Sequence, residues 1–491
     1  MAEHYLAFDL GASSGRAILG RFGDDNRLQI REVHRFPNQM LNVMGTLHWD
    51  VFRLYEEILQ GMRILATGYA SSPAGIGIDT WGIDFGLFDA QGSLIGNPVA
   101  YRDRRTEGAM QEFFSKLPRK KLFALTGIQF LPFNTVFQLY AMVRDKSPQL
   151  DIAADLLFIP DIFNYFLTGI RKTEFTFATT SQLYNPVTNA WDDEIFRQLR
   201  IPKNLMQEVV PPGTVLGKHT ENVSALTGLQ PVPVIAGASH DTGSAVAAVP
   251  ASGDDFAYIS CGTWSCMGIE SRKPLINEKT LAYNITNEGG VGGTFRVLKN
   301  IAGLWLLQEC RKEWAKARDY SYDELVKMAE NTQTLTTIVD LDRPEFLNPA
   351  SMPHAISDFC HATGQPAPHN IGEFVRVILQ SLALAYRYVL GQLEEVKGKR
   401  IERLHIIGGG SQNGLLCQLA ADATGLPVHA GPAEATAIGN LLVQAMALGR
   451  LASLEALREV VRRSFDLTTY EPRHTSDWDK AFEHFKRLKQ Q

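Results

Sequence analysis

Short runs in which apolar and polar residues alternate cover the start of the chain and predict β-strands joined by tight turns. Residues 6–10, 16–22 and 28–36 have the period of two that strands require, and Gly- and polar-rich turns separate them. Residues 51–66 then have apolar side chains at helical spacing, and strands are predicted again at 75–79 and 85–89. This antiparallel start is not the strict strand–helix alternation of a dinucleotide-binding fold.

The second half begins with another strand-like run, residues 256–259, and later alternates between helices and strands. Residues 374–393 form one long apolar stripe at helical spacing. A strand at 403–407 leads into Gly408, Gly409 and Gly410, after which Ser411 or Asn413 can cap a helix that reaches about residue 423. A further helix is predicted at 436–448, and the last stretch contains one amphipathic helix.

Length and breaker residues divide the chain into domains. With 491 residues the chain is too long for one typical core. Residues 249–254 are polar and rich in turn-forming residues, so we expect a boundary there. The expected division is an N-terminal lobe at 1–248, a C-terminal lobe at 249–465 and a tail at 466–491.

Composition excludes several classes of partner. The 48 Lys and Arg residues against 53 Asp and Glu give a net charge of −5, without a basic stripe for nucleic acid. No apolar stretch is long enough to span a bilayer, and the N-terminus lacks the anatomy of a signal peptide. The five cysteines lack zinc spacing; Cys261 and Cys266 could pair, but reduced thiols in the cytoplasm are favoured. The sequence predicts no oligomeric state.

A local pattern occurs twice, once in each half. Residues 8–16 (FDLGASSGR) and 259–265 (ISCGTWS) each carry an apolar strand into a turn of Gly and hydroxyl residues, from which a second apolar run leaves. Backbone N–H groups and hydroxyls in such turns suit phosphate, and two copies suggest two related lobes that grip one polyphosphate. Asp9 lies beside this turn, and a carboxylate next to a phosphate requires a divalent cation between the two negative groups. Such a cation commonly contacts the carboxylate through water.

The first turn also matches G-x-S-x-G, the nucleophile elbow of hydrolases. That elbow requires a helix after the turn, and residues 16–22 read as a strand instead, which argues against Ser13 as a nucleophile. The P-loop and the dinucleotide fingerprint are both absent, so a nucleotide must be held in another way.

Three further groups carry candidate chemistry. Asp241 follows a buried strand at 232–236 and precedes a helix of small residues; a general base is favoured there over helix capping. Asp79 and Asp84 flank Trp81 and Gly82, a pair that fits close approach of a sugar, although Asp84 could equally cap its own turn. The three glycines 408–410 let a planar group lie on the backbone, or form a flexible loop.

These residues together resemble the sugar kinases related to glycerol kinase and xylulokinase, over essentially the whole chain. The resemblance rests on both hairpins, Asp241, the late glycines and the strings GIDTWG (77–82), GIQFLPFNT (127–135), ASHDT (238–242) and ITNEGG (285–290). It implies an α/β fold of two ribonuclease-H-like lobes, of the actin/hexokinase type, with the active site in the cleft between them. It also implies ATP and Mg2+ as cofactors, a small sugar as substrate, and no nucleic-acid or membrane partner.

The resemblance implies a role for each site residue. Asp241 would take the proton from the sugar hydroxyl, and Asp9 would lie behind Mg2+. The residues implied to contact the sugar are Gly82, His240, Thr242 and Asn300. The residues implied to hold ATP are Ala12, Ser13, Ser14, Gly15, Arg16 and Thr263 at the phosphates, with Gln308 and Gly409 near the nucleoside.

The chain departs from the common pattern of these kinases at two positions. Gln138 stands where most have Lys in the helix after Asn-Thr, and Tyr101 stands where most have Trp. Besides the hydrolase, the alternatives are a kinase for another ketose, such as L-fuculose or L-xylulose, and a sugar or ATP sensor of the same fold without activity. The presence of Asp9 and Asp241 argues against the sensor.

Overall fold

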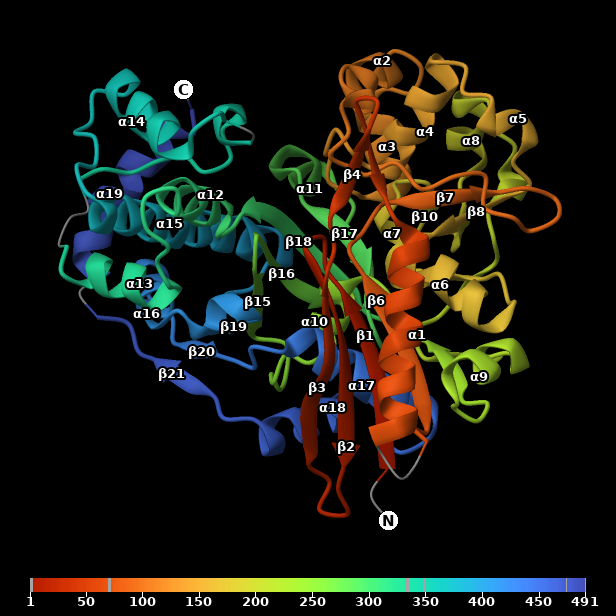
Figure 1. Cartoon of the computed structure of the whole chain (residues 1–491). Helices are drawn as coiled ribbons and strands as arrows, with labels where there is room; N and C mark the ends of the chain where they lie inside the picture. Colours follow the sequence, from red (N-terminus) through yellow and green to blue (C-terminus); the bar gives the residue numbers. More distant parts are fainter. Residues whose placement is uncertain (1–2, 69–71, 333–335, 348, 474, 491) are drawn as a thin grey trace. The chain divides into compact units, whose positions relative to one another are not determined.

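The computed structural model describes residues 3–68, 72–332, 336–347, 349–473 and 475–490. Its chain divides into two compact units (Figure 1): unit 1 holds Met1–Pro250, Glu270–Val297 and Ala435–Ser464, and unit 2 holds Ala251–Ile269, Leu298–Glu434 and Phe465–Gln491. The first crossing, at Pro250, lies beside the expected boundary at 248. The later crossings return 270–297 and 435–464 to unit 1, which the sequential division 1–248, 249–465 and 466–491 does not include.

Unit 1 is built on a six-stranded sheet in the order β13-β14-β6-β1-β2-β3. The strands β1, β2 and β3 are antiparallel, β6 and β14 run parallel to β1, and β13 is antiparallel to β14. The antiparallel start predicted from the sequence is therefore confirmed. The bounds are β1 Glu3–Leu10, β2 Ser14–Phe22, β3 Leu28–Pro37, β6 Gly75–Thr80, β13 Thr214–Lys218 and β14 Pro233–Ala236.

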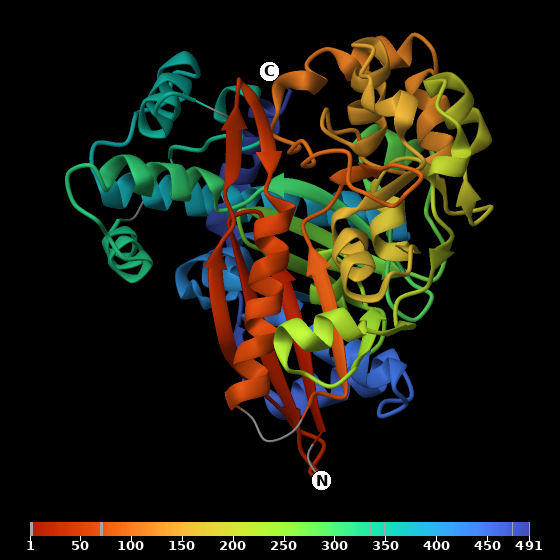
Figure 2. The same ribbon diagram turned by 45° about the vertical axis from the view of Figure 1, so that its right-hand side comes forward.

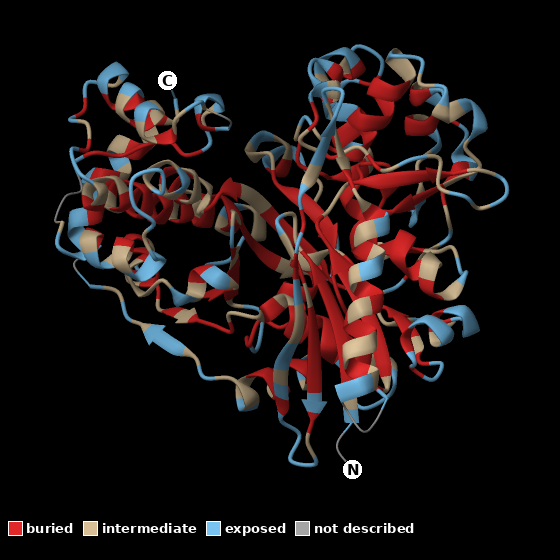
Figure 3. Ribbon diagram, in the orientation of Figure 1, coloured by how far each residue is buried: buried red, intermediate tan, exposed pale blue. Residues whose placement is uncertain are grey.

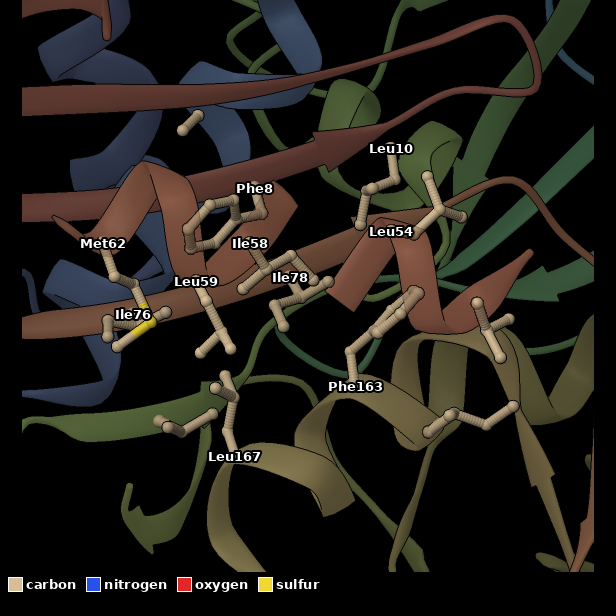
Figure 4. Close-up of a cluster of buried hydrophobic side chains, with 14 of the residues drawn as sticks. Phe8, Leu10, Leu54, Ile58, Leu59, Met62, Ile76, Ile78, Phe163 and Leu167 are labelled. Carbon is tan, nitrogen blue, oxygen red and sulfur yellow. The ribbon is translucent and has the colours of Figure 1, made fainter. Parts of the chain in front are cut away.

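Each face of this sheet is covered by helices because successive side chains of β1 and β6 point to opposite sides. Figure 4 shows Phe8, Leu10, Ile76 and Ile78 packed against Leu54, Ile58, Leu59 and Met62 of α1 and against α6. Figure 2 shows α1 lying along this face of the sheet. The helices concerned are α1 Val51–Gly68, α6 Ile159–Thr168 and α9 Glu221–Thr227 on this side, with α10 Asp241–Ala247, α17 Ala435–Ala447 and α18 Leu454–Ser464 on the other.

Helix α17 approaches the sheet closely because β6 presents glycines to it. A Cβ on Gly77 would lie 2.4 Å from the Asn440 side chain, and a Cβ on Gly439 would lie 1.8 Å from the Ser244 carbonyl oxygen of α10. Glycine at these two positions is therefore a packing requirement. Figure 3 shows the central strands of this sheet as largely buried, whereas the edge strands β3 and β13 carry many exposed or half-exposed residues.

The rest of unit 1 is rich in aromatic residues and has its own core around Phe113, Phe137 and Phe158. Its helices are α2 Ala109–Phe114, α3 Arg119–Thr126, α4 Thr135–Arg144, α5 Gln149–Ile152, α7 Phe175–Thr180, α8 Asp193–Leu199 and α11 Glu278–Tyr283, with 3-10 turns Arg104–Thr106 and Lys203–Leu205. Its strands are β4 Met40–Val43, β5 Thr46–Trp49, β7 Phe85–Phe88, β8 Asp155–Phe158, β9 Thr173–Glu174, β10 Tyr184–Asn185, β11 Ala190–Trp191, β12 Val209–Val210 and β17 Thr286–Gly289.

Unit 2 repeats the strand pattern at the centre of unit 1. Strand β15 is antiparallel to β16 and parallel to β19, as β1 is antiparallel to β2 and parallel to β6. Within this sheet the strands lie in the order β18-β16-β15-β19-β20-β21. The chain passes between unit 2 and unit 1 within β16 and again within β18. The bounds are β15 Phe256–Cys261, β16 Trp264–Ser271, β18 Phe295–Ala302, β19 Arg403–Ile407, β20 Val428–Ala430 and β21 Thr468–Tyr470.

The longest helix, α15, forms the centre of the helical layer of unit 2. By length and composition α15 alone among the helices of the described chain could cross a membrane, but 72% of its apolar window is buried inside the protein, as in a core helix. The helices of unit 2 are α12 Trp305–Trp314, α13 Tyr322–Glu330, α14 Met352–Ala362, α15 Ile371–Lys397, α16 Gly414–Thr424 and α19 Thr475–Leu488, with 3-10 turns Pro344–Phe346 and Gly409–Gln412. All five cysteines are free and buried.

Candidate active site

Two carboxylates lie side by side at the ends of adjacent parallel strands of unit 1. Asp9 of β1 is in register with Asp79 of β6, and both lie on the α17 side of the sheet. Arg16 Nη2 donates to Asp9 Oδ2 at 2.6 Å, and Asn440 Nδ2 donates to Asp79 Oδ2 at 2.5 Å. Within the described chain, buried Asp79 Oδ1 has no hydrogen-bond partner. Burial raises the pKa of Asp79, and the nearby charges of Asp9 and Asp241 raise it further.

Asp241 stands at the first position of α10, after a short segment that follows β14 and contains Ser239 and His240. Thr242 donates to Asp241 Oδ1 through its backbone N–H at 2.5 Å and its hydroxyl at 3.0 Å. Among the described residues these hydrogen bonds all reach Oδ1, which makes Oδ2 the oxygen available to a proton. The side chain is 32% exposed. Surrounding protein nevertheless desolvates it and raises its pKa, as does the charge of Asp9, while His240 lowers it.

His240 connects Asp241 with a buried ion pair. Its Nε2 lies 3.4 Å from Asp241 Oδ1, and its Nδ1 lies 3.1 Å from Arg296 Nη2 and 3.5 Å from Glu288 Oε2. A guanidinium can only donate, so the shorter contact makes Nδ1 an acceptor and assigns the proton of a neutral imidazole to Nε2. Arg296 also pairs with Glu288 at 3.1 Å and donates from Nε to the Gly289 carbonyl oxygen.

The buried carboxylate of Glu174 supports the segment that leads into α10. Glu174 accepts hydrogen bonds from the backbone N–H groups of Thr176, Phe177 and Ser239, and the Thr176 hydroxyl also donates to it. That hydroxyl oxygen in turn accepts from His240 N at 3.2 Å. Burial raises the pKa of Glu174 to about 7. Glu174 and Thr176 therefore fix the backbone that carries His240 and Asp241.

The first hairpin forms as predicted and is a strand–turn–strand. Gly11 N donates to Ser14 O at 2.9 Å, and β2 begins at Ser14. Since a strand and not a helix follows, the context of a hydrolase elbow is absent. Ser13 is exposed and Ala12 is half-exposed. Gly15 is buried, and a Cβ there would lie 2.2 Å from Phe36, so packing alone requires this glycine.

In unit 2 the second hairpin is tied to the start of α12. Thr263 Oγ1 donates to Gln308 Oε1 at 3.1 Å, and Thr263 O accepts from Gly303 N and Trp305 N, both at 3.2 Å. Thr263 and Gln308, which the sequence assigns to one ligand, are therefore direct neighbours. Asn300 lies on β18, where its Oδ1 is 3.1 Å from Cys266 Sγ.

The glycines at the end of β19 differ in what they pack against. A Cβ on Gly410 would lie 2.2 Å from Cys261 Sγ, and a Cβ on Gly408 would lie 3.1 Å from Cys261 O. Gly409 is exposed, with nothing within 4 Å of such an atom. Gly409 is thus the open position of the three, against which a planar group can lie.

The turn after β6 carries backbone strain. Asp84 N donates to Gly82 O at 3.0 Å around Ile83, whose φ is +69°. A β-branched residue avoids this region at a cost of about 1–3 kcal/mol, and such strain persists only where surrounding contacts impose it. A Cβ on Gly82 would lie 3.1 Å from His240 Nε2, which places this turn beside His240.

Comparison with known proteins covers the whole chain. The N-terminal domain of the FGGY family of carbohydrate kinases matches residues 4–248, and its C-terminal domain matches residues 257–448. The chain belongs to the FGGY family of carbohydrate kinases. It is 46% identical over 486 residues to the rhamnulokinase of Bacteroides thetaiotaomicron, a match that covers 99% of each chain. The rhamnulokinases of Pectobacterium atrosepticum (44%, 99% of this chain and 97% of the relative) and Oceanobacillus iheyensis (41%, 96% and 98%) are also similar.

Solved structures of several kinases share the fold. The gluconate kinase of Lactobacillus acidophilus superposes with a TM-score of 0.83 at 15% identity and covers 100% of this chain and 98% of its own. The ADP-bound glycerol kinase of Plasmodium falciparum superposes with a TM-score of 0.79 at 16% identity and covers 100% and 98%. The expected α/β kinase fold with two domains is thereby confirmed.

Sequence reasoning did not identify Glu174, Glu288 or Arg296. Glu288 belongs to the string ITNEGG, and β17, which contains it, is buried throughout. A charged residue in an otherwise buried strand requires a partner of opposite charge, which is the signal that points to such a residue.

Proposed function

We propose that this FGGY kinase is a rhamnulokinase, which transfers the γ-phosphoryl group of ATP to the C1 hydroxyl of L-rhamnulose in the cytoplasmic catabolism of L-rhamnose. The observation that carries the proposal is the 41–46% identity to relatives named rhamnulokinase over 96–99% of the chain. The cluster of Asp241, His240 and Gly82 in unit 1 supports it, because it offers a base and a hydrogen-bond donor beside an open backbone.

In the proposed reaction Asp241 Oδ2 accepts the proton of the C1 hydroxyl as the oxygen attacks the γ-phosphorus. A new P–O bond forms to the sugar, the bond from the γ-phosphorus to the β,γ-bridging oxygen breaks, and ADP leaves. Phosphoryl transfer depends mainly on positioning and charge stabilisation. His240 with its Nε2 proton, Gly82 and Thr242 would hold the sugar in unit 1, and Asn300 is the proposed sugar contact of unit 2.

ATP would be held through backbone and hydroxyl groups. Ala12, Ser13, Ser14, Gly15 and Arg16 of the first hairpin are proposed to bind phosphates. In unit 2, Thr263 is proposed at the phosphates, with Gln308 and exposed Gly409 beside the nucleoside. No assignment here requires a P-loop, since hairpin N–H groups can bind phosphate directly.

Mg2+ fits the oxygen donors at the ends of β1 and β6. Among the residues that the structure describes, no three His, Cys, Asp or Glu side chains are grouped to hold a metal. Mg2+ needs no such group, because one or two carboxylates, water and the substrate phosphates commonly suffice. Asp9 would hold the ion through water, and Asp79, in register with Asp9 on β6, has one carboxylate oxygen without a hydrogen-bond partner among the described residues. The ion would neutralise charge on the phosphates.

The proposal is tested by measuring ADP release with L-rhamnulose, L-fuculose, L-xylulose, D-xylulose and glycerol. We expect the highest kcat/KM with L-rhamnulose, and a product whose phosphorus-31 signal is split by the two C1 protons. A higher kcat/KM with another ketose would assign that sugar as the substrate. The absence of sugar-dependent ADP release from folded protein would favour the sensor.

Replacing Asp9 with Asn should shift the Mg2+ dependence to higher concentration and slow the transfer. Asn keeps the size of the side chain and one acceptor for Arg16, but it removes the negative charge that holds a hydrated cation. The measurement is a Mg2+ titration of the rate, with the KM for sugar as a control that should change little. A titration curve that superimposes on that of the wild type would remove Asp9 from this role.

Replacing Ser13 with Ala should weaken ATP binding by only about five- to tenfold, because one neutral hydrogen bond contributes roughly 1 kcal/mol. The KM for ATP of the variant checks this, and Ser13→Thr, which keeps the hydroxyl, is the matched control. If Ser13 were a nucleophile, the Ala variant would be inactive and the wild type would form a covalent adduct with serine-reactive esters, visible by mass spectrometry.

A further inference from the structure

Asp84 is the centre of a buried hydrogen-bond cluster beside the strained turn. Its Oδ2 accepts from Trp49 Nε1 at 2.6 Å, Trp81 Nε1 at 3.0 Å and Tyr101 N at 3.2 Å, and its Oδ1 accepts from Gln138 Nε2 at 3.0 Å. The side chain is fully buried. Three of these donors reach Oδ2 and one reaches Oδ1, so both oxygens of the carboxylate are engaged. Asp84 is thus suited to hold its neighbours in place, and it does not cap its own turn.

The groups around Asp84 fix the geometry of the turn from several sides. The two indole rings of Trp49 and Trp81 pack with centroids 4.2 Å apart. The Thr135 hydroxyl donates to the Ile83 carbonyl oxygen at 2.6 Å. Trp81 and Asp84 are buried, whereas Gly82 and Ile83 between them are half-exposed. The buried ends of the turn therefore hold its open middle in a conformation that Ile83 would not adopt alone.

Gln138 connects this cluster to a positive charge. Its Nε2 donates to Asp84 Oδ1 and to Phe133 O at 2.9 Å, while its Oε1 accepts from Arg105 Nη2 at 2.5 Å. Here a neutral amide stands between Asp84 and Arg105, and it can satisfy both only in one orientation.

We propose that Asp84 and Gln138 are positioning residues that hold the turn from Trp81 to Asp84 in the shape that receives the sugar, and so set sugar affinity. This inference rests on the proposed function, since Gly82 and His240 are the sugar contacts there. Neither Asp84 nor Gln138 touches the substrate: both are fully buried, and both oxygens of Asp84 already accept hydrogen bonds from the protein. Their effect reaches the sugar through Gly82, which lies against His240 Nε2.

The test compares Asp84→Asn, Gln138→Glu and the double variant. Asp84→Asn turns an amide donor toward the Gln138 amide, and we expect the KM for sugar to rise roughly 10- to 100-fold, the range for a hydrogen bond to a charged group. The KM for ATP should stay near the wild-type value. Gln138→Glu places two carboxylates together and should also raise the KM for sugar. In the double variant the new amide at position 84 can donate to the new carboxylate at position 138, which still accepts from Arg105. The KM for sugar of the double variant should therefore be lower than that of either single variant.

Two substitutions at Thr135, which hydrogen-bonds to the same turn, should have smaller effects on the KM for sugar. Thr135→Val removes the hydrogen bond to Ile83 O at nearly constant volume and should raise the KM for sugar about fivefold, as expected for one neutral hydrogen bond. Thr135→Ser keeps the hydroxyl and should behave like the wild type. Thermal unfolding of each variant shows that it is folded, so this pair tests the inference even if Asp84→Asn does not fold.

The proposal is overturned if the effects of the two single changes simply multiply in the double variant, or if the KM values for sugar and ATP rise together. It is also overturned if Thr135→Val binds sugar as the wild type does. Turnover of the wild type on L-rhamnulose separately tests the proposed function. Near-ultraviolet circular dichroism of the Trp49–Trp81 pair should be altered in Asp84→Asn and restored toward the wild-type signal in the double variant, whichever ketose proves to be the substrate.

Discussion

Replacing Asp241 with Asn should lower turnover by roughly 10²- to 10⁴-fold, the usual contribution of a general base, while the protein stays folded and binds sugar. Asn keeps the Oδ1 acceptor for the two hydrogen bonds from Thr242. It cannot accept the proton of the attacking hydroxyl. Single-turnover rates with saturating ATP and calorimetric sugar binding measure the two effects separately.

The pH dependence of kcat/KM gives a second test of the role of Asp241. Because burial and Asp9 raise the pKa of Asp241, the carboxylate that acts as base is lost earlier on acidification than an ordinary Asp would be. In the wild type kcat/KM should therefore fall as the pH is lowered through this raised value. The Asn variant should lack that acid limb. Near-normal turnover of folded Asp241→Asn would remove Asp241 from the mechanism.

Replacing Arg296 with Met should destabilise the protein by about 3–5 kcal/mol, because it leaves a buried carboxylate without its partner. The Arg296 side chain is fully buried and that of Glu288 is 8% exposed. Burial alone would raise the pKa of Glu288, but the charge of Arg296 holds it below its usual range. The contribution of the pair is therefore present at neutral pH and is lost as the pH falls through the lowered pKa of Glu288. Urea unfolding measures the change.

The double variant Glu288→Gln with Arg296→Met separates stability from the role toward His240. It removes both charges and should recover much of the lost stability. Arg296→Met should also raise the KM for sugar, because His240 Nδ1 loses the donor that keeps the proton on Nε2, and the double variant should not lower that KM again. Nitrogen-15 NMR of the His240 ring reports the tautomer directly. An unchanged tautomer in folded Arg296→Met would contradict the assignment.

Elements whose signal lies within a few neighbouring turns were predicted well from the sequence. The helix expected at 51–66 is α1 Val51–Gly68, the strand at 403–407 is β19, and Asn413 caps α16 as one of the two residues proposed. The hairpin of β4 and β5 was missed. Its residues Leu41, Val43 and Met44 are exposed, so no burial pattern marks it. Local periodicity identifies elements that bury one face, and this hairpin does not.

In the candidate site, the positions of the carboxylates could be predicted from the sequence, but their hydrogen-bond partners could not. Asp9, Asp79 and Asp241 follow strand ends, and the sequence could place them there. Which distant side chain satisfies each one depends on tertiary packing: Asn440 reaches Asp79 from 361 positions away, and Arg296 reaches His240 from 56. Asp84 shows the limit most clearly, because its four donors come from four separate segments. From the sequence alone, a self-capping turn was an equally good interpretation.

Unit 1 is built from three separate segments of the chain, so it can be completed only after the last of them has been synthesised. Residues 1–250 emerge first with α10 but not α17 on the inner face of their sheet, and α17, which covers that face over Asp79, Gly75 and Gly77, begins only at Ala435. At about 5–20 residues per second, the roughly 180 residues between them delay closure by about 10–40 s. The nascent chain therefore carries this face of the sheet without α17 while those residues are made, and an N-terminal fragment released at residue 250 would keep the face uncovered by α17.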